Sequence, residues 1–349
     1  MVEAGSSEKH ERIPPGQTLL FSEPIFKFSE EELREVQSFV VPAGTESWVE
    51  GLPLESRENE RAYKTEYLAI AKGLKDMGVP YRVIIAHREL LDMPFVLGFM
   101  TRLGVRGLGL SPQIPYTSFP RDFMVNFDGL VYLNPEANIK FPDGSGTFSP
   151  LGEGGRVLKS GKKVLIPDPN GFREHAGQIS RHAAKLSDVF RVGQIPHPVA
   201  IDIIPETGEK NVFTNSHLDR VSALVKGQDG KDYLVMEESY AASETPRVGK
   251  YWPIIQRTCR DLEIEPVVVT QTADSIPGRM NMVQFADRSV LLTGGDESLE
   301  NIVAEIVGRD NTYTTETPIV NYPLFRKGGI RCMTLFAPDK IVGQPLVRQ

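Results

Sequence analysis

One local pattern recurs along this chain and limits what it can fold into. Two short extended runs flank a tight turn, and a helical run and a further extended run follow. The extended pairs are expected over 123–133, 156–166, 221–236 and 282–292. Asp128-Gly129 is the strongest turn signal, because an Asp-Gly pair between hydrophobic runs favours a hairpin. A chain built from such units is predicted to be an α/β protein.

Helices and single strands are expected between the hairpins. The spacing of apolar residues predicts helices over 58–73, 172–186, 250–262 and 298–307. Extended runs are expected over 81–85, 201–204, 266–270 and 319–336. The unit returns at irregular intervals of roughly 40 to 80 residues. Because the units share no obvious residues, they are interpreted as structural rather than sequence repeats.

The chain is expected to form one domain over 17–349, since no stretch has the composition of a long linker. Residues 1–16 are charged and contain Gly, Ser and Pro, which predicts a flexible tail. The start of the chain has no apolar segment of the kind found in secretory signals. No apolar run approaches the ~18 residues of a membrane span. A cytoplasmic protein without a membrane partner is therefore expected.

Charge and cysteine content narrow the classes of function. The formal net charge is −7, which argues against general nucleic-acid binding, because that needs a positive surface. Two cysteines far apart in 349 residues form neither a disulfide framework nor a zinc spacing. Scarce cysteine also favours a reducing compartment.

Cys332 stands in the string Lys327-Gly328-Gly329-Ile330-Arg331-Cys332-Met333-Thr334. The two glycines remove side-chain bulk and permit a turn with positive φ. An extended run over 330–336 is expected to present the thiol at the start of a strand. Lys327 and Arg331 stand beside it and favour the thiolate. The other cysteine, Cys259, falls in a helical run and is expected to be inert packing.

Three further strings carry acids and a histidine. Asp122 stands in Phe-Pro-Arg-Asp-Phe, Glu153 in Leu-Gly-Glu-Gly-Gly, and His217 and Asp219 in Ser-His-Leu-Asp. If the last segment is a strand, His217 and Asp219 share one face. With Cys332, these residues supply a nucleophile, a base and an anionic pocket, which suits a cationic substrate. The alternatives are that Asp122 caps a turn or pairs with a nearby cation, and that Glu153 is a plain turn residue.

The four strings together resemble the guanidino-group-modifying enzymes, which include arginine and agmatine deiminases, dimethylarginine hydrolases and amidinotransferases. The resemblance covers about 119–338 and lies in the order and spacing of the motifs. It implies the pentein fold, a five-bladed α/β propeller with pseudo-fivefold ββαβ repeats. It also implies a small guanidino substrate, no cofactor and no metal; a homo-oligomer stays possible.

The resemblance also assigns roles residue by residue. Cys332 corresponds to the nucleophile and His217 to the general base and acid. Glu153 and Asp122 correspond to carboxylates that hold the guanidinium, and Asp219 to a second acid. One further position, Phe119, corresponds to a phenylalanine that packs on the substrate.

The chain departs from the deiminase pattern at the residue after Glu-Gly-Gly. Many deiminases have an acid there, and this chain has Arg156. Arg156 is expected either to read an anionic end of the substrate or only to solvate a hairpin, and Lys327 and Arg331 are also expected to bind the substrate. Tyr116 also stands where an arginine deiminase is expected to have asparagine, so free arginine is not assigned as the substrate. Hydrolysis, amidino transfer and a non-catalytic binding module stay open as functions.

Overall fold

The computed structural model describes part of the chain. The described residues are 12–22, 55–83, 121, 124–135, 139–140, 144–172, 174–203, 210–214, 217–245, 249–272, 275–276, 278–319, 329–340 and 347–348. Phe119, Asp122 and Lys327 lie outside them, as does most of the predicted tail. At the end of that tail, Arg12 is anchored, since its guanidinium lies 2.8 Å from a carboxylate oxygen of Asp287.

Within these ranges, five three-stranded sheets share one connectivity. An inner strand pairs antiparallel with a middle strand, which pairs parallel with an outer strand. Written from inner to outer, the sheets are β3 (Met124–Phe127), β4 (Leu130–Leu133) and β6 (Thr147–Phe148); β7 (Leu158–Ser160), β8 (Lys163–Pro167) and β9 (Arg191–Ile195); β12 (Ser222–Lys226), β13 (Asp232–Glu237) and β16 (Ile264–Val269); β17 (Val283–Gln284), β18 (Val290–Leu292) and β19 (Thr312–Thr314); and β20 (Thr334–Pro338), β1 (Gln17–Phe21) and β2 (Arg82–Val83).

Shorter pairs complete the described strands. They are β10 (Val199–Ile203) with β11 (Lys210–Thr214), β14 (Glu244–Thr245) with β15 (Gly249–Lys250), and β5 (Ile139–Lys140) with β21 (Val347–Arg348). The predicted α/β class is confirmed as a fold of several small sheets with helices.

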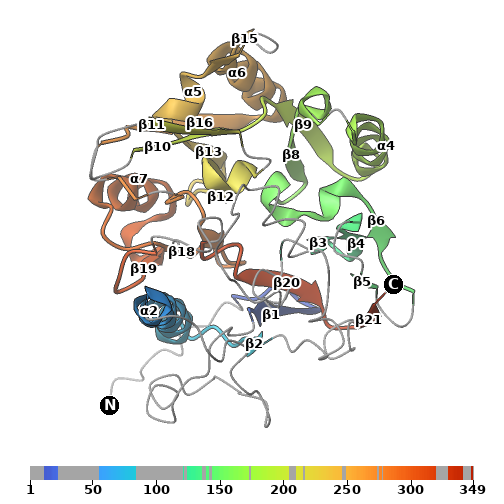
Figure 1. The fold of residues 1–349 in the computed structure, drawn as a ribbon. Coiled ribbons are helices and arrows are strands. Elements are labelled where there is room, and N and C mark those ends of the chain that lie inside the picture. Colours follow the sequence, from blue (N-terminus) through green and yellow to red (C-terminus); the bar gives the residue numbers. More distant parts are fainter. Residues whose placement is uncertain are drawn as a thin grey trace, which may run out of the picture.

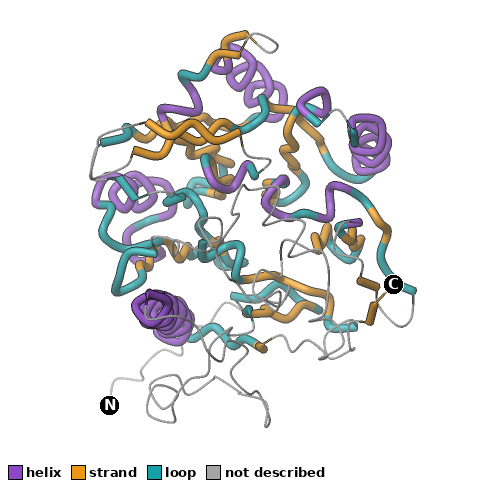
Figure 2. Tube along the Cα trace, in the orientation of Figure 1, coloured by secondary structure: helices purple, strands orange, loops and turns teal. Residues whose placement is uncertain are grey.

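A helix connects the middle and outer strands in four of the described sheets, which is the usual crossover between parallel strands. These helices are α2 (Glu55–Asp76), α4 (Ala176–Ser187), α6 (Tyr251–Leu262) and α7 (Glu297–Val307); the short α5 (Glu238–Ala241) precedes α6. Figures 1 and 2 show the four long helices at the periphery, and strands such as β12, β18 and β20 nearer the middle. The predicted order of hairpin, helix and strand is therefore confirmed in the three units that contain α4, α6 and α7; in the unit of α2, the antiparallel partner of β1 is β20, far away in sequence.

Local sequence accounts for the hairpins. In the turn between β3 and β4, Asp128 and Gly129 both have positive φ, 51° and 95°. That is the conformation a two-residue turn of this type requires, and it explains the Asp-Gly pair. The turn between β7 and β8 contains Gly161, whose φ is also positive, at 53°.

Helix α6 shows how the outer helices are attached. Tyr251, Ile255, Cys259 and Leu262 are buried and follow one another at three- or four-residue spacings. They pack in one hydrophobic cluster with Leu165 of β8 and with residues of the β12–β13–β16 sheet. Cys259 is fully buried there, as its predicted packing role requires.

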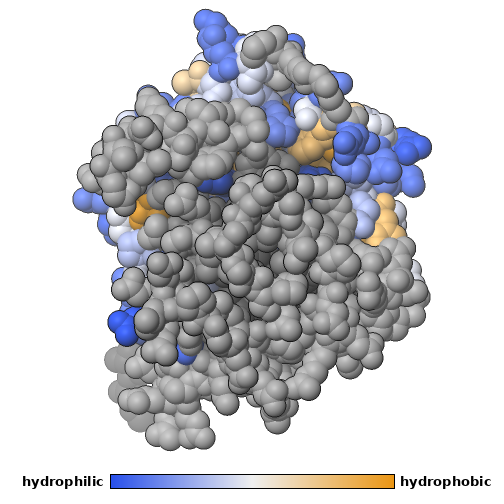
Figure 3. Space-filling view, in the orientation of Figure 1, coloured by the Kyte–Doolittle hydropathy of each residue, from blue (hydrophilic) through white to orange (hydrophobic). Residues whose placement is uncertain are grey.

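The surface of the described residues carries few large apolar side chains. Those exposed are Leu130, Val189 and Val268. Figure 3 shows hydrophobic colour only in small, separate patches among the described residues on this face. No helix in the described ranges combines the length and apolar character that crossing a bilayer needs.

A central cavity of about 470 Å³ lies among the inner strands. Its lining includes residues of β3, β7, β12, β17 and β20, one inner strand from each three-stranded sheet. The described residues directly before β7, β12, β17 and β20 form short turns or loops. Glu153, His217, Asp219 and Cys332 stand in these preceding segments and are not among the residues that line the cavity.

Candidate active site

Cys332 lies in a turn that leads into β20. The N–H of Met333 donates to the carbonyl of Gly329 at 3.1 Å, and Thr334 donates to Arg331 at 3.3 Å. The expected extended run over 330–336 is thus wrong in its first half, because β20 begins at Thr334. The thiol is 1% exposed.

Gly329 is required for close packing rather than for a positive φ. It is not among the positive-φ glycines of the described residues. A Cβ atom at this position would lie 2.7 Å from both Cβ and Oδ1 of Asn281. The glycine therefore lets the Asn281 side chain approach the turn that carries Cys332.

Two side chains contact the sulfur of Cys332. Nδ2 of Asn281 donates to Sγ at 3.1 Å. The thiol donates to Oδ2 of Asp219 at 3.7 Å. The backbone N–H of Cys332 also donates to Oδ1 of Asn281 at 3.1 Å. The sulfur therefore contacts both an N–H donor and a carboxylate.

His217 and Asp219 are brought together by a tight helical turn, and the expectation that they share one face of a strand is wrong. His217 is the N-cap of the 3₁₀ helix η8 (Leu218–Arg220), which precedes β12. Its Nδ1 lies 3.9 Å from Oδ1 of Asp219. Its Nε2 bonds Oε1 of Glu153, which comes from the segment before β7.

The glycines around Glu153 explain how that segment reaches the histidine. Glu153 connects two 3₁₀ turns, η5 (Pro150–Gly152) and η6 (Gly154–Arg156). A Cβ atom at Gly155 would lie only 2.2 Å from Nδ1 of His217. The imidazole therefore packs directly on the backbone of Gly155, and any side chain there would displace the ring.

Arg156 is held by Glu153. Its Nη2 pairs with Oε2 of the Glu153 carboxylate, and its Nη1 donates to the carbonyl of Pro150 at 3.3 Å. The guanidinium also lies over the ring of Phe172, 5.0 Å from its centroid. Neither expectation for Arg156, an anionic substrate end or hairpin solvation, describes this contact. Both carboxylate oxygens of Glu153 are thus engaged, one by His217 and one by Arg156.

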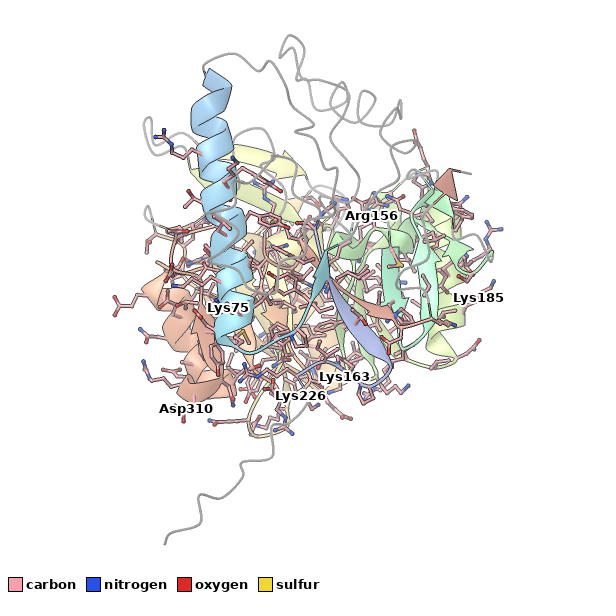
Figure 4. All side chains as sticks on the ribbon, turned by 90° about the horizontal axis from the view of Figure 1, so that it is seen from below. Lys75, Arg156, Lys163, Lys185, Lys226 and Asp310 are labelled. Carbon is pink, nitrogen blue, oxygen red and sulfur yellow. The ribbon has the colours of Figure 1, made fainter. Side chains whose placement is uncertain are left out.

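Figure 4 helps to locate this end of the molecule. Arg156 lies toward one side of the fold, and Lys163 and Lys226, at hairpin ends, lie toward the other. The hairpin turns and the segments that precede the inner strands are therefore at opposite ends of those strands.

Two arginines, Arg331 and Arg121, contact Asp219 and the backbone of the Cys332 turn. Nη1 of Arg331 is 3.2 Å from Oδ2 of Asp219, and its Nη2 donates to the carbonyl of Val157 at 2.6 Å. The Nε of Arg121 donates to the carbonyls of Arg331 and Thr334 at 2.7 and 2.8 Å. Burial and the neighbouring Arg331 lower the pKa of Arg121 to about 9, so it is a cation at neutral pH. The charge of Arg331 is directed at Asp219.

The group of donor atoms is compact. A ring nitrogen of His217, a carboxylate oxygen of Asp219 and the sulfur of Cys332 lie within 4.8 Å of one another, and all three residues are buried. Cysteine, histidine and carboxylate are ligands that Zn²⁺ accepts. The same three atoms suit acid–base and nucleophilic chemistry, which was the expectation from sequence.

Two residues that the motifs did not assign to the site, Asn281 and Arg121, also contact Cys332 or the turn that carries it. Asn281 contacts Cys332 twice, and Arg121 braces the turn before β20. The signal that could have found Asn281 is its position just before an inner strand, which the motif residues share. Asp122 and Phe119, expected on the substrate, lie outside the described residues, as does Lys327.

Comparison with known proteins gives a likeness in structure. No family model matches the sequence, and no curated protein matches it significantly. Among solved structures, the chain is similar to DDAH from Pseudomonas aeruginosa, solved with citrulline (TM-score 0.45, 9% identity, 92% of this chain and 99% of that one). It is also similar to the N-terminal domain of ArgZ, an arginine dihydrolase of the ornithine-ammonia cycle in cyanobacteria (TM-score 0.48, 14% identity, 94% of this chain and 98% of that one). A third similar structure is that of SxtG, an amidinotransferase from Microseira wollei (TM-score 0.48, 12% identity, 97% of this chain and 97% of that one).

Proposed function

We propose that this protein cleaves a C–N bond at the guanidine or amidine carbon of a small, arginine-like molecule, with Cys332 as the nucleophile. The observation that carries the proposal is the meeting of the Cys332 sulfur with His217 and Asp219 within 4.8 Å. These residues come from the segments before β20 and β12, far apart in sequence. A nucleophile, a base and an orienting carboxylate within reach of one another form the arrangement that covalent catalysis uses.

The proposed reaction begins with attack of the Cys332 thiolate on the guanidine carbon. A C–S bond forms, and the tetrahedral adduct collapses when His217 gives a proton to the departing amine. The C–N bond breaks and a thiouronium intermediate stays on the sulfur. His217 then takes a proton from water, which attacks the same carbon. The C–S bond breaks, and a ureido product leaves.

The contacts support different proposed roles for the carboxylates. Glu153 has one oxygen on His217 and the other on Arg156, so its proposed role is to orient the imidazole and stabilise its protonated form. Asp219 lies beside the sulfur, so it is a better candidate than Glu153 to accept hydrogen bonds from the N–H groups of a guanidinium. Asp122, two positions before β3 in the sequence, is proposed as its counterpart on the basis of the motif alone.

The arrangement of sheets supports a proposal for the fold as well. Five sheets with the same connectivity contribute inner strands to one cavity. We propose that they are the blades of a five-bladed α/β propeller that forms a single domain, with the substrate entering where the inner strands begin.

The deciding experiment is a panel of guanidine compounds that includes arginine, agmatine and methylated arginine. Each is scored for ammonia or amine release and for the ureido product, with and without an added acceptor amine. Release of a ureido product supports hydrolysis, whereas an amidinated acceptor without ureido product supports amidino transfer. Binding without turnover of any compound would instead support a non-catalytic binding module.

Two cysteine variants provide the matched control. Cys332→Ser should abolish turnover, because a serine hydroxyl is not activated by the same surroundings. Cys259→Ala removes the other thiol, in the α6 packing cluster, and should retain turnover. Equal loss of turnover in both variants would contradict the proposal.

A further inference from the structure

Residues with reactive or charged side chains stand shortly before several of the inner strands. Glu153 precedes β7, Asp219 precedes β12 and Cys332 precedes β20. Asn281 stands at the corresponding place before β17, two positions ahead of its first residue, as Cys332 does before β20. The repeat therefore points to Asn281 as a member of the site, although no motif marks it.

The Asn281 carboxamide holds Cys332 at two atoms. It accepts from the Cys332 backbone N–H at 3.1 Å and donates to the sulfur at 3.1 Å. Its Nδ2 also lies 3.5 Å from the carbonyl of Asp219. Asn281 is 6% exposed, so water offers little competition for these bonds.

The chemistry of the partners fixes the orientation of this amide. A backbone N–H can only donate, so the amide atom that faces the Cys332 nitrogen must be the oxygen. The amide nitrogen is then the atom that faces the sulfur. The N–H···S hydrogen bond therefore follows from the bonding partners of the amide, and does not depend on an arbitrary assignment of its oxygen and nitrogen atoms.

We infer that Asn281 is a positioning residue that fixes the Cys332 turn and stabilises the thiolate through its N–H donor. The inference deepens the proposed function, because it rests on Cys332 being the nucleophile. The contact matters because the carboxylate of Asp219, 3.7 Å from the sulfur, favours the protonated thiol. A hydrogen bond donated to the sulfur favours the charged form, and Arg331 offsets the same carboxylate from 3.2 Å.

The test is the pH dependence of Cys332 alkylation by iodoacetamide, followed by peptide mapping, which needs no substrate. Asn281→Asp keeps the size and an oxygen for the Cys332 N–H but replaces the donor with an anion. The pH at which alkylation reaches half its maximal rate should rise by about one unit, which makes alkylation near neutral pH about tenfold slower. Asn126→Asp is the matched control, because Asn126 bonds the carbonyl of Phe336 later in β20; its profile should match that of the unmodified protein.

A second variant protects the test against misfolding. If Asn281→Asp does not fold, Asn281→Ala removes the donor with a smaller side chain, and the same slowing is expected. A folded Asn281 variant whose alkylation profile superimposes on that of the unmodified protein would overturn the inference. Because alkylation is independent of turnover, this outcome is distinct from a failure of the proposed function, which the guanidine panel reports.

Discussion

Replacing Gly155 by alanine should damage catalysis through His217 alone. The added Cβ would lie 2.2, 2.7 and 2.9 Å from Nδ1, Cγ and Cε1 of the imidazole. Ordinary contact begins near 3.4 Å, so the ring must withdraw by roughly 1 Å. A misplacement of about 1 Å can cost a catalytic step about 100-fold. We therefore expect about a 100-fold fall in turnover on whichever guanidine compound proves to be a substrate.

Stability should change much less than turnover. Gly155 does not have a positive φ, so alanine is compatible with its backbone. Overpacking of this kind typically costs about 1–3 kcal/mol, which a shift in the thermal unfolding midpoint would report. Gly177→Ala is the matched control, because it makes the same chemical change in α4, where a Cβ would meet nothing within 4 Å. That variant should keep full turnover and be slightly stabilised.

Turnover within twofold of the unmodified protein, in a folded Gly155→Ala variant, would refute the reasoning. It would mean either that the ring yields without cost or that His217 is not the acid and base of the reaction. Alkylation of Cys332 in the same variant separates these effects from a general collapse of the site, because the thiol should still react.

Three further outcomes are expected. A halo-amidine at pH 8 should label Cys332 and spare Cys259, because burial raises the pKa of the Cys259 thiol to about 12 and keeps it protonated; peptide mapping that finds Cys259 modified first would reverse the assignment. Arg156→Ala should lower turnover of arginine and agmatine to a similar degree, because Arg156 contacts Glu153; kinetics that show loss only with carboxylated substrates would return it to substrate recognition. Chelator treatment should leave turnover unchanged, whereas added Zn²⁺ should inhibit by binding the donor atoms of His217, Asp219 and Cys332; loss of ammonia release in chelator would show that a metal is required.

The stability of the Cys259 region also has a predictable pH dependence. Its thiol has an ordinary pKa of 9.0 and a folded pKa of about 12. The folded state therefore keeps a proton that the unfolded chain loses between these values. The stabilisation is complete below about pH 9 and is lost as the pH rises toward 12. Thermal unfolding followed across this range should show the decline.

Local sequence determined the elements of this fold. The Asp128-Gly129 pair specifies its hairpin because few residues adopt two successive positive φ angles. The spacing of buried residues specifies α6, because residues three and four apart lie on one face of a helix. These signals act over a few residues, so they can be read without knowing what the segment packs against. The motifs likewise marked Cys332, His217, Asp219 and Glu153 as candidate site residues by residue type.

The tertiary structure decided what each of these residues contacts. Glu153 meets His217 across 64 positions, and Asn281 meets Cys332 across 51. Pairings at such separations depend on how the inner strands are brought together, which no local pattern encodes. The glycines illustrate the limit: the sequence indicated that Gly329 keeps side-chain bulk away from the Cys332 segment, and it assigned no packing role to Gly155. Only the packed structure showed that the excluded space belongs to His217 and to Asn281.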